Sequence, residues 1–126
     1  MTGLFQLGDF VLHSGSRSCW KIDCDVLSDD DLGVLAVIAV ERLTLFRPFG
    51  YVVGIPNGGL RLAGALSRYR TLGASRVLIV DDVLTTGASM REKRLDLSRN
   101  DVLGLVIFAR TRAEPWVHRI FQMDVG

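Results

Sequence analysis

The stretch Val77–Met90 constrains the fold more than any other part of the sequence. It opens with four apolar, mostly β-branched residues, Val77 to Val80, which predict a short strand buried on both faces of a parallel sheet. Two carboxylates, Asp81 and Asp82, follow directly. We therefore expect this acid pair at the carboxyl end of a central strand, which is where ligands bind in open α/β sheets.

A small, hydroxyl-rich turn comes next and leads into a segment with helical spacing. Its backbone N–H groups, its hydroxyl groups and a helix N-terminus direct donors at one point, which suits a phosphate. This Thr-Thr-Gly turn consists of Thr85, Thr86, Gly87, Ala88 and Ser89. The acid pair needs another ligand, such as a sugar diol or a hydrated divalent cation. A ribose 5-phosphate satisfies both halves, whereas an ordinary strand, turn and capped helix would need no ligand.

The acid pair and the Thr-Thr-Gly turn together resemble the phosphoribosyl pyrophosphate (PRPP) motif of type I phosphoribosyltransferases. The resemblance implies that Asp81 and Asp82 hold the ribose hydroxyls and Mg²⁺, and that the turn binds the 5-phosphate. It also implies an α/β fold, with a Rossmann-like parallel sheet flanked by helices and a small hood over the base. Residues 1–126 would form one such domain, with the hood built from about residues 1–27 and 110–126.

A second strand and turn precede this motif. Tyr51–Ile55 predicts a buried strand, and a segment with helical spacing begins at Leu60. The Pro-Asn-Gly-Gly turn between them consists of Pro56, Asn57, Gly58 and Gly59, and its paired glycines permit close approach of the backbone to a ligand. It resembles the pyrophosphate loop of the same family. Arg61 is either a further cation for pyrophosphate or an exposed helix arginine.

The N-terminal segment predicts a hairpin outside the main pattern, with strands at Phe10–Leu12 and Lys21–Asp25. It resembles the hood segment of orotate phosphoribosyltransferases. His13 stands where many relatives carry a lysine that contacts substrate, and Lys21 stands where they often carry an aromatic that lies on the base. Substrate contact and ordinary surface positions remain alternatives for both residues.

Two further elements complete the predicted core. Ser28 and the acids that follow it predict the start of an amphipathic helix, because such residues cap a helix and complement its dipole. Residues 101–108 predict a third buried strand, which ends at Ala109 and Arg110. Arg110 matches the arginine that pairs with the orotate carboxylate in the resembling enzymes, and a solvent-exposed arginine is the alternative. The aromatic tail beyond it would complete the hood or a dimer face.

The segment between Leu66 and Arg76 is short. Orotate enzymes usually carry here a long mobile loop that closes over pyrophosphate and excludes water. Arg68 and Arg70 could replace part of its charge, within the chain or from a partner subunit. The short segment is the main argument for an alternative function, a regulatory protein that binds PRPP or a nucleotide without catalysis.

Composition narrows the expected partners and cellular location. A formal charge of +1 in 126 residues gives no global field for nucleic acid or a membrane, and we expect neither as a partner. The longest apolar run has seven residues, so a cytoplasmic protein is expected. Cys19 and Cys24 are expected as reduced thiols rather than a disulfide. The interpretation is a phosphoribosyltransferase, dimeric like its relatives, that uses PRPP, Mg²⁺ and an orotate-like pyrimidine.

Overall fold

The computed structural model describes residues 3–12, 15 and 17–123, which form six strands, three α-helices and three short 3₁₀ turns. The strands are β1 (Phe5–Val11), β2 (Arg17–Ile22), β3 (Tyr51–Gly54), β4 (Val77–Leu84), β5 (Val102–Ala109) and β6 (Val117–Gln122). The α-helices are α1 (Asp29–Arg42), α2 (Gly59–Leu66) and α3 (Ala88–Leu97).

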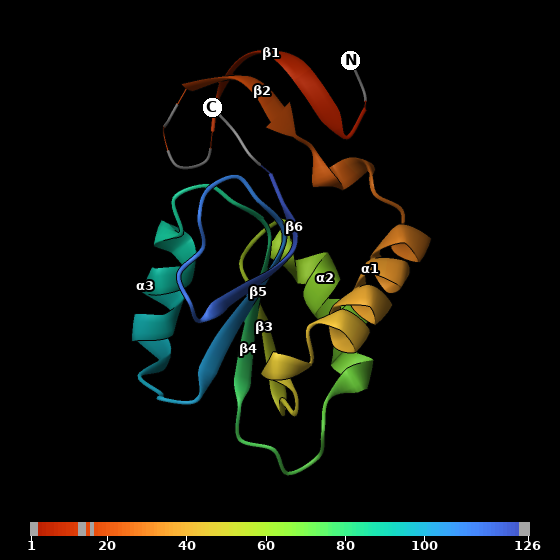
Figure 1. Ribbon diagram of the computed structural model, residues 1–126, viewed down its shortest axis with the longest axis vertical. Helices are drawn as coiled ribbons and strands as arrows, with labels where there is room; N and C mark the ends of the chain where they lie inside the picture. Colours follow the sequence, from red (N-terminus) through yellow and green to blue (C-terminus); the bar gives the residue numbers. More distant parts are fainter. Residues whose placement is uncertain (1–2, 13–14, 16, 124–126) are drawn as a thin grey trace.

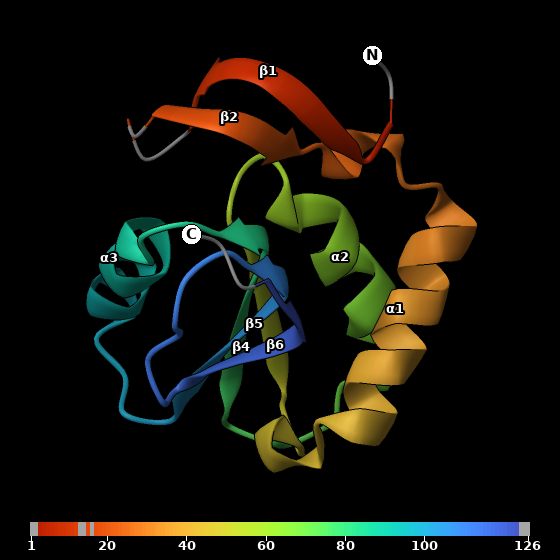
Figure 2. The ribbon, with the colours of Figure 1, turned by 45° about the horizontal axis from the view of Figure 1, so that its top comes forward.

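Four parallel strands form the main sheet in the order β3-β4-β5-β6. Helices α1 and α2 cover one face of this sheet and α3 covers the other (Figure 1). Strands β1 and β2 pair antiparallel in a separate small sheet, which lies across the carboxyl ends of the main strands (Figure 2). The predicted α/β fold with a flanked parallel sheet is confirmed.

The two faces of the main sheet bury two apolar clusters. Leu78 and Val80 of β4 pack with residues of α1 and α2, whereas Val77 and Ile79 pack with Met90 of α3. All four β4 residues are at most 2% exposed. The prediction of a strand buried on both faces is therefore confirmed, because each face is covered by its own helix layer.

Helix α1 begins as the sequence predicts. The Ser28 hydroxyl accepts a hydrogen bond from the backbone N–H of Asp31 at 3.0 Å, and the Asp31 carboxylate accepts one from the N–H of Ser28 at 2.9 Å. This capping box satisfies two backbone donors that the first turn would otherwise leave unpaired. Leu32 and Ala36 follow on the buried face of the helix.

Three predicted boundaries are wrong. Strand β4 does not end at the acid pair but continues through it to Leu84, because β5 remains paired with it as far as Ala109. The two hairpin strands run over Phe5–Val11 and Arg17–Ile22 rather than Phe10–Leu12 and Lys21–Asp25, and Cys24–Val26 forms a 3₁₀ turn. All three errors concern pairing between segments, which a single strand's composition does not reveal.

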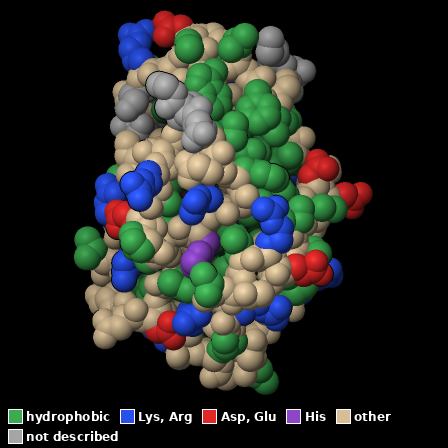
Figure 3. Space-filling view, in the orientation of Figure 1, with side chains coloured by type: hydrophobic (Ala, Val, Ile, Leu, Met, Phe, Trp, Pro, Cys, Tyr) green, Lys and Arg blue, Asp and Glu red, His purple; other side chains and the backbone are tan. Residues whose placement is uncertain are grey.

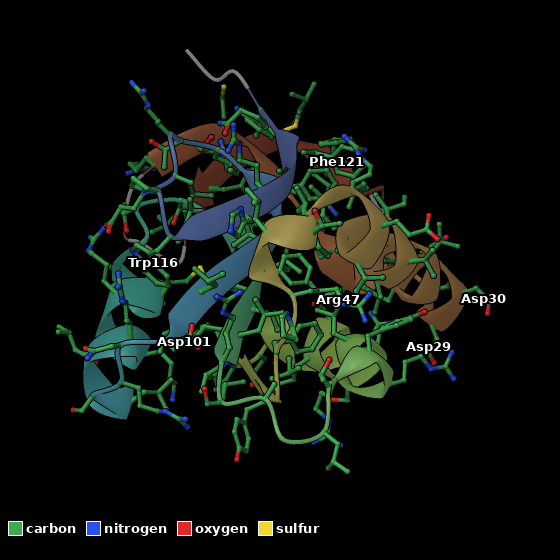
Figure 4. The ribbon with its side chains drawn as sticks, turned by 60° about the horizontal axis from the view of Figure 1, so that its bottom comes forward. Asp29, Asp30, Arg47, Asp101, Trp116 and Phe121 are labelled. Carbon is green, nitrogen blue, oxygen red and sulfur yellow. The ribbon has the colours of Figure 1, made fainter. Side chains whose placement is uncertain are left out.

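The C-terminal tail corrects a fourth expectation. Within residues expected to complete the hood, Val117–Gln122 forms β6, the edge strand of the main sheet beside β5. Its aromatic residue nevertheless faces the small sheet: Phe121 stacks on Phe108 at 5.4 Å, and Phe108 meets Phe5 of β1 edge-to-face at 5.9 Å. Phe121 is labelled in Figure 4. The tail therefore supports the small sheet through Phe108, which lies between Phe121 and Phe5.

The segment that joins α2 to β4 lies at the amino ends of the main strands, opposite the small sheet (Figure 1). It includes the 3₁₀ turn Ser67–Tyr69 and is anchored by a hydrogen bond from the Thr71 N–H to the Phe49 carbonyl at 2.8 Å. No helix of the described residues has the length and apolarity needed to cross a bilayer.

Candidate functional site

A cavity of about 500 Å³ lies between the carboxyl ends of the main strands and the small sheet. It brings together segments from the whole length of the chain. The predicted site residues that line it are Lys21, Pro56, Asn57, Gly58, Asp81, Asp82, Thr85, Thr86, Gly87, Ala88, Ser89 and Arg110. Two turns that are separate in sequence thus open into a single cavity.

Gly59 is the one predicted site residue that does not line this cavity. It is buried as the first residue of α2 and packs on β4, where an added β-carbon would collide with the Val80 carbonyl and lie 3.0 Å from the Asp81 Cα. Its absent side chain lets α2 pack closely on the sheet. Gly59 therefore has a packing role, and its contact with a ligand stays a prediction.

Gly58 joins the Pro-Asn-Gly-Gly turn to the acid pair. A β-carbon on Gly58 would collide with both the carboxylate carbon and an oxygen of Asp82. The backbone of this turn therefore lies directly against the Asp82 carboxylate, and only glycine permits the contact. A ligand that touches one of these groups is within reach of the other.

The Thr-Thr-Gly turn has the geometry of an anion site. Gly87 has a φ of +83°, which side chains other than glycine rarely adopt, and it leads directly into α3. The Thr86 hydroxyl accepts a hydrogen bond from the Ala88 N–H at 3.3 Å, and the first turn of α3 contains no acidic residue. Helix N–H groups and hydroxyls can therefore face a phosphate without a competing carboxylate in the first turn of the helix.

A network of side chains behind the turn fixes its backbone. The Arg91 guanidinium donates to the Thr86 carbonyl at 3.1 Å and to the Glu114 carboxylate at 2.9 Å. Glu114 also accepts a 2.8 Å hydrogen bond from the Trp116 indole, which lies beside α3 (Figure 4). These hydrogen bonds from Trp116 and Arg91 lower the pKa of Glu114. No sequence pattern had indicated this network, because it joins α3 to a loop after β5.

The acid pair is half-buried and held by backbone donors. The Asp82 N–H donates to the Asp81 carboxylate at 2.8 Å, and the Val83 N–H donates to the Asp82 carboxylate at 2.7 Å. Burial, and then the hydrogen bond and negative charge of Asp82, raise the pKa of Asp81 to about 8. The ligand-free pair therefore holds a proton near neutral pH, and a cation or a hydroxyl donor would favour its release.

The donor set fits a magnesium ion that is shared with a substrate. Among the described residues, no group of three or more His, Cys, Asp or Glu side chains is positioned to hold a metal. Two carboxylates alone do not complete an octahedral shell, but Mg²⁺ commonly takes one or two carboxylates and fills its shell with water and substrate phosphates. Asp81 and Asp82 are the residues available for such an ion.

The small sheet contributes the opposite wall of the cavity. Lys21 lies over the Phe10 ring, with its Nζ 5.0 Å from the ring centroid. Arg110 reaches up from the end of β5 and stacks on the Trp20 ring at 3.7 Å. Its Nη1 donates to the Trp20 carbonyl at 3.2 Å and its Nη2 to the Ser18 hydroxyl at 2.9 Å. Arg110 therefore both lines the cavity and connects the two sheets.

Other candidate residues lie away from the cavity. Arg61 donates to the Leu27 carbonyl at 2.8 Å and pairs with Asp29 at 3.0 Å, so it fastens α2 to the start of α1. Arg68 and Arg70 belong to the segment at the opposite end of the sheet. His13 falls outside the described residues.

Both cysteines are free thiols, as predicted. Cys19 is exposed and Cys24 is buried, so the two lie in different environments. Burial, reinforced by the negative charge of Asp82 and of neighbouring acids, raises the pKa of the Cys24 thiol to about 12. Cys24 is therefore a neutral packing residue near the acid pair.

Comparisons with known proteins give matches only among solved structures. No protein-family model matches the sequence, and no curated protein matches it. The orotate phosphoribosyltransferase from Aeropyrum pernix superimposes with a TM-score of 0.72 at 25% identity, over 95% of this chain and 88% of that chain. The Leishmania donovani UMP synthase gives a TM-score of 0.76 at 19% identity, over 95% of this chain and 34% of that chain.

A purine phosphoribosyltransferase from Pyrococcus horikoshii is also similar, with a TM-score of 0.54 at 18% identity over 78% of this chain and 86% of that chain. The orotate enzyme and the UMP synthase cover more of the chain, so the likeness extends beyond the main sheet to the small one. Together with the two turns that open into one cavity, these matches identify the chain as having the type I phosphoribosyltransferase fold, similar to orotate phosphoribosyltransferases but with only a short segment between α2 and β4.

Proposed function

We propose that the protein is a phosphoribosyltransferase that uses PRPP and Mg²⁺ to transfer a 5-phosphoribosyl group to a nitrogen base. The observation that carries the proposal is the contact between Gly58 and the Asp82 carboxylate. It brings the Pro-Asn-Gly-Gly turn, the acid pair and the Thr-Thr-Gly turn around one cavity, so that a diphosphate, a sugar diol and a 5-phosphate can be bound together.

The chemistry requires positioning and charge stabilisation rather than a covalent nucleophile. As pyrophosphate leaves C1 of the ribose, positive charge develops on the ring, and the nitrogen of the base then attacks. Asp81 and Asp82 would accept hydrogen bonds from the ribose hydroxyls and stabilise that charge. Residues 85–89 would anchor the 5-phosphate, and Asn57 with Gly58 would bind pyrophosphate. A bound Mg²⁺ would supply further neutralisation of the phosphate charges.

The acceptor we propose is an orotate-like pyrimidine. Support comes from the similarity to the Aeropyrum pernix orotate phosphoribosyltransferase, and from a cavity wall in which the cations Lys21 and Arg110 accompany apolar side chains of the small sheet. A cationic wall suits a base that carries an acidic group.

Two measurements test the proposal. Titration calorimetry should detect binding of PRPP in the presence of Mg²⁺, and a pyrophosphate-release assay over a panel of free bases should then give turnover with orotate. Adenine, hypoxanthine and uracil serve as comparison bases. An absence of PRPP binding would overturn both the activity and the assignment of the turns.

A regulatory protein that binds PRPP or a nucleotide without catalysis is the second candidate. The short segment between α2 and β4 favours it, because that segment lies at the end of the sheet away from the cavity and cannot cover bound pyrophosphate within its own chain. Tight PRPP binding with no pyrophosphate release for any base would decide for this candidate.

We also propose a homodimer. Exposed apolar side chains occur on β1, α1 and β6, with Leu7 75%, Val34 59% and Phe121 38% exposed. Figure 3 shows hydrophobic side chains gathered along the upper right of one face. A second copy would remove such surface from water. Sedimentation equilibrium should give a mass near twice 13.9 kDa, and a monomer mass would rule the dimer out.

A further inference from the structure

We propose that Lys21, and not Arg110, is the residue that recognises an acidic group on the acceptor base, and that Arg110 instead positions the small sheet above the cavity. The inference rests on the proposed transfer reaction and names a specificity-determining residue within it. It also reverses the role that the resemblance to orotate enzymes gives to Arg110.

The contacts of Arg110 explain why it is poorly placed to bind a ligand. One face of its guanidinium is covered by the Trp20 ring at 3.7 Å, and both terminal nitrogens already donate to β2, to the Trp20 carbonyl and the Ser18 hydroxyl. A carboxylate that formed a bidentate pair with Arg110 would have to displace these hydrogen bonds. The cost would include the loss of contacts between the two sheets.

The partly buried charge of Arg110 is stabilised within the protein. Burial lowers the pKa of the Arg110 guanidinium, which nevertheless remains charged, because a guanidinium does not lose its proton in proteins. Among the described residues no carboxylate pairs with it. The charge is stabilised instead by the Trp20 ring and by two neutral oxygens, an arrangement that matches a structural link between strands.

Lys21 differs from Arg110 in the contacts of its charged group. It also lines the cavity, it belongs to β2, and within residues 3–12, 15 and 17–123 it forms no ion pair. Within the same residues its ammonium has one cation–π contact, with the face of Phe10, where the Nζ lies 5.0 Å from the ring centroid. A lysine ammonium has three donors on a flexible stem, so it can turn towards an anion without breaking hydrogen bonds.

The surroundings of Lys21 define the class of acceptor. Phe10, Val11, Leu12 and Ile22 give the same wall an apolar surface, and among the described residues that line the cavity only the acid pair carries negative charge. The wall therefore suits a flat ring with a single acidic substituent on the side that faces the small sheet. A carboxylated pyrimidine has this shape, whereas an unsubstituted one leaves Lys21 without an anion.

The test compares two nucleotides that differ only in the carboxylate. Orotidine 5′-monophosphate and uridine 5′-monophosphate share the ribose, the 5-phosphate and the pyrimidine ring, so the ratio of their dissociation constants by calorimetry reports the carboxylate alone. We expect the wild-type protein to prefer orotidine 5′-monophosphate by about 10- to 100-fold, the range for a hydrogen bond to a charged group.

Three variants separate the two residues. Lys21→Met should lose most of that preference and leave uridine 5′-monophosphate binding within about twofold. Arg110→Gln should weaken both nucleotides by a similar factor and keep the preference. Lys93→Met, at the chain's only other lysine, which is outside the cavity lining, should change neither constant.

Each result decides the inference. Loss of the preference in Arg110→Gln together with its retention in Lys21→Met would return the role to Arg110. Equal affinity of the wild-type protein for both nucleotides would overturn the inference. The proposed transfer reaction would still stand, and pyrophosphate-release assays with PRPP and other bases would then test it. If neither nucleotide binds and PRPP does not bind either, the proposed function is overturned as well.

Discussion

The two walls of the cavity are built in different ways. The lower wall stands on β4, whose first four residues are at most 2% exposed, and its two turns are joined by the contact of Gly58 with Asp82. The upper wall is a two-stranded sheet with mostly exposed or half-buried residues. It is connected to the core by Arg110 and by the edge-to-face pair of Phe5 and Phe108.

This difference separates two functions. A two-stranded sheet is marginally stable by itself and needs packing against another element, so a few contacts determine its position. Under the proposed function, the deeply packed wall would hold PRPP, a substrate whose geometry is fixed. The lightly attached wall is suited to the acceptor, for which neighbouring enzymes use different bases.

The largest effect is expected from Asp82→Asn. It removes a charge aimed at the cationic ribose and should lower kcat by about 10²- to 10³-fold. Pyrophosphate release under saturating PRPP measures this loss, and Asp96→Asn on the exposed side of α3 is the matched control. Unchanged turnover in Asp82→Asn would remove the charge-stabilising role.

Gly58→Ala should have the next largest effect. Its β-carbon would force apart the Pro-Asn-Gly-Gly turn and the Asp82 carboxylate, and small misplacements in a site commonly lower kcat/KM by about 100-fold. Gly64→Ala, in open space on α2, is the control, and we expect it to stabilise the protein by about 0.5–1 kcal/mol. Equal activity of both variants would show that the contact is not needed.

The stability of the lower wall should depend on pH through Asp81. Its pKa is about 8 in the folded chain against an ordinary value of 3.8, so between these values the folded state binds the extra proton. Stability should therefore fall as pH rises from 4 to 8, by on the order of 2 kcal/mol because the carboxyl keeps some contact with water. Denaturant unfolding of Asp81→Asn should lack this part of the slope, and an identical slope would argue against the raised pKa.

Arg110→Gln should affect the upper wall alone. The loss of its stacking and hydrogen bonds to β2 should raise amide hydrogen exchange in β1 and β2 by about tenfold, with β4 and β5 unchanged. Arg119→Gln, at an exposed position of β6, should leave all four strands as in the wild type. A uniform increase in exchange would mean that the two walls open together.

The smallest effect is expected from Arg91→Gln. This change removes the donors to the Thr86 carbonyl and to Glu114 and should raise the KM for PRPP about three- to fivefold, since an exposed ion pair contributes little. Arg91→Lys should recover part of the loss. Arg94→Gln, which removes only the cation over the Trp116 ring, should leave the KM unchanged; a rise equal to that of Arg91→Gln would point to a general change in α3.

The lower wall was largely predictable from sequence because its determinants are local. The apolar run of β4, the acid pair and the Thr-Thr-Gly turn are consecutive, and each residue type has its own physical reason to stand there. The failures involve pairing across the chain. Strand β6 was expected as a tail because its partner is β5, far away in the sequence. The close packing of Gly59 against the Val80 carbonyl likewise cannot be seen in a turn sequence.

The upper wall was predicted only in outline. A hairpin was expected from turn residues, but its second strand was misplaced. The register of that strand is set by pairing with Phe5–Val11, and its position by Arg110, which lies 92 residues after Ser18. Resemblance indicated that Arg110 and Lys21 belong to the site. The division of work between them depends on side-chain contacts that no motif encodes.

The continuation of β4 through the acid pair has one further consequence. Asp81 is paired with Val106 in the ladder of the main sheet, so the carboxylates stand on regular strand backbone rather than on a loop. Their orientation is thus settled when the domain folds, and the arrival of a sugar requires no rearrangement of the chain beneath it. A change of acceptor would then leave β4 and its acid pair unchanged and would alter the small sheet above them.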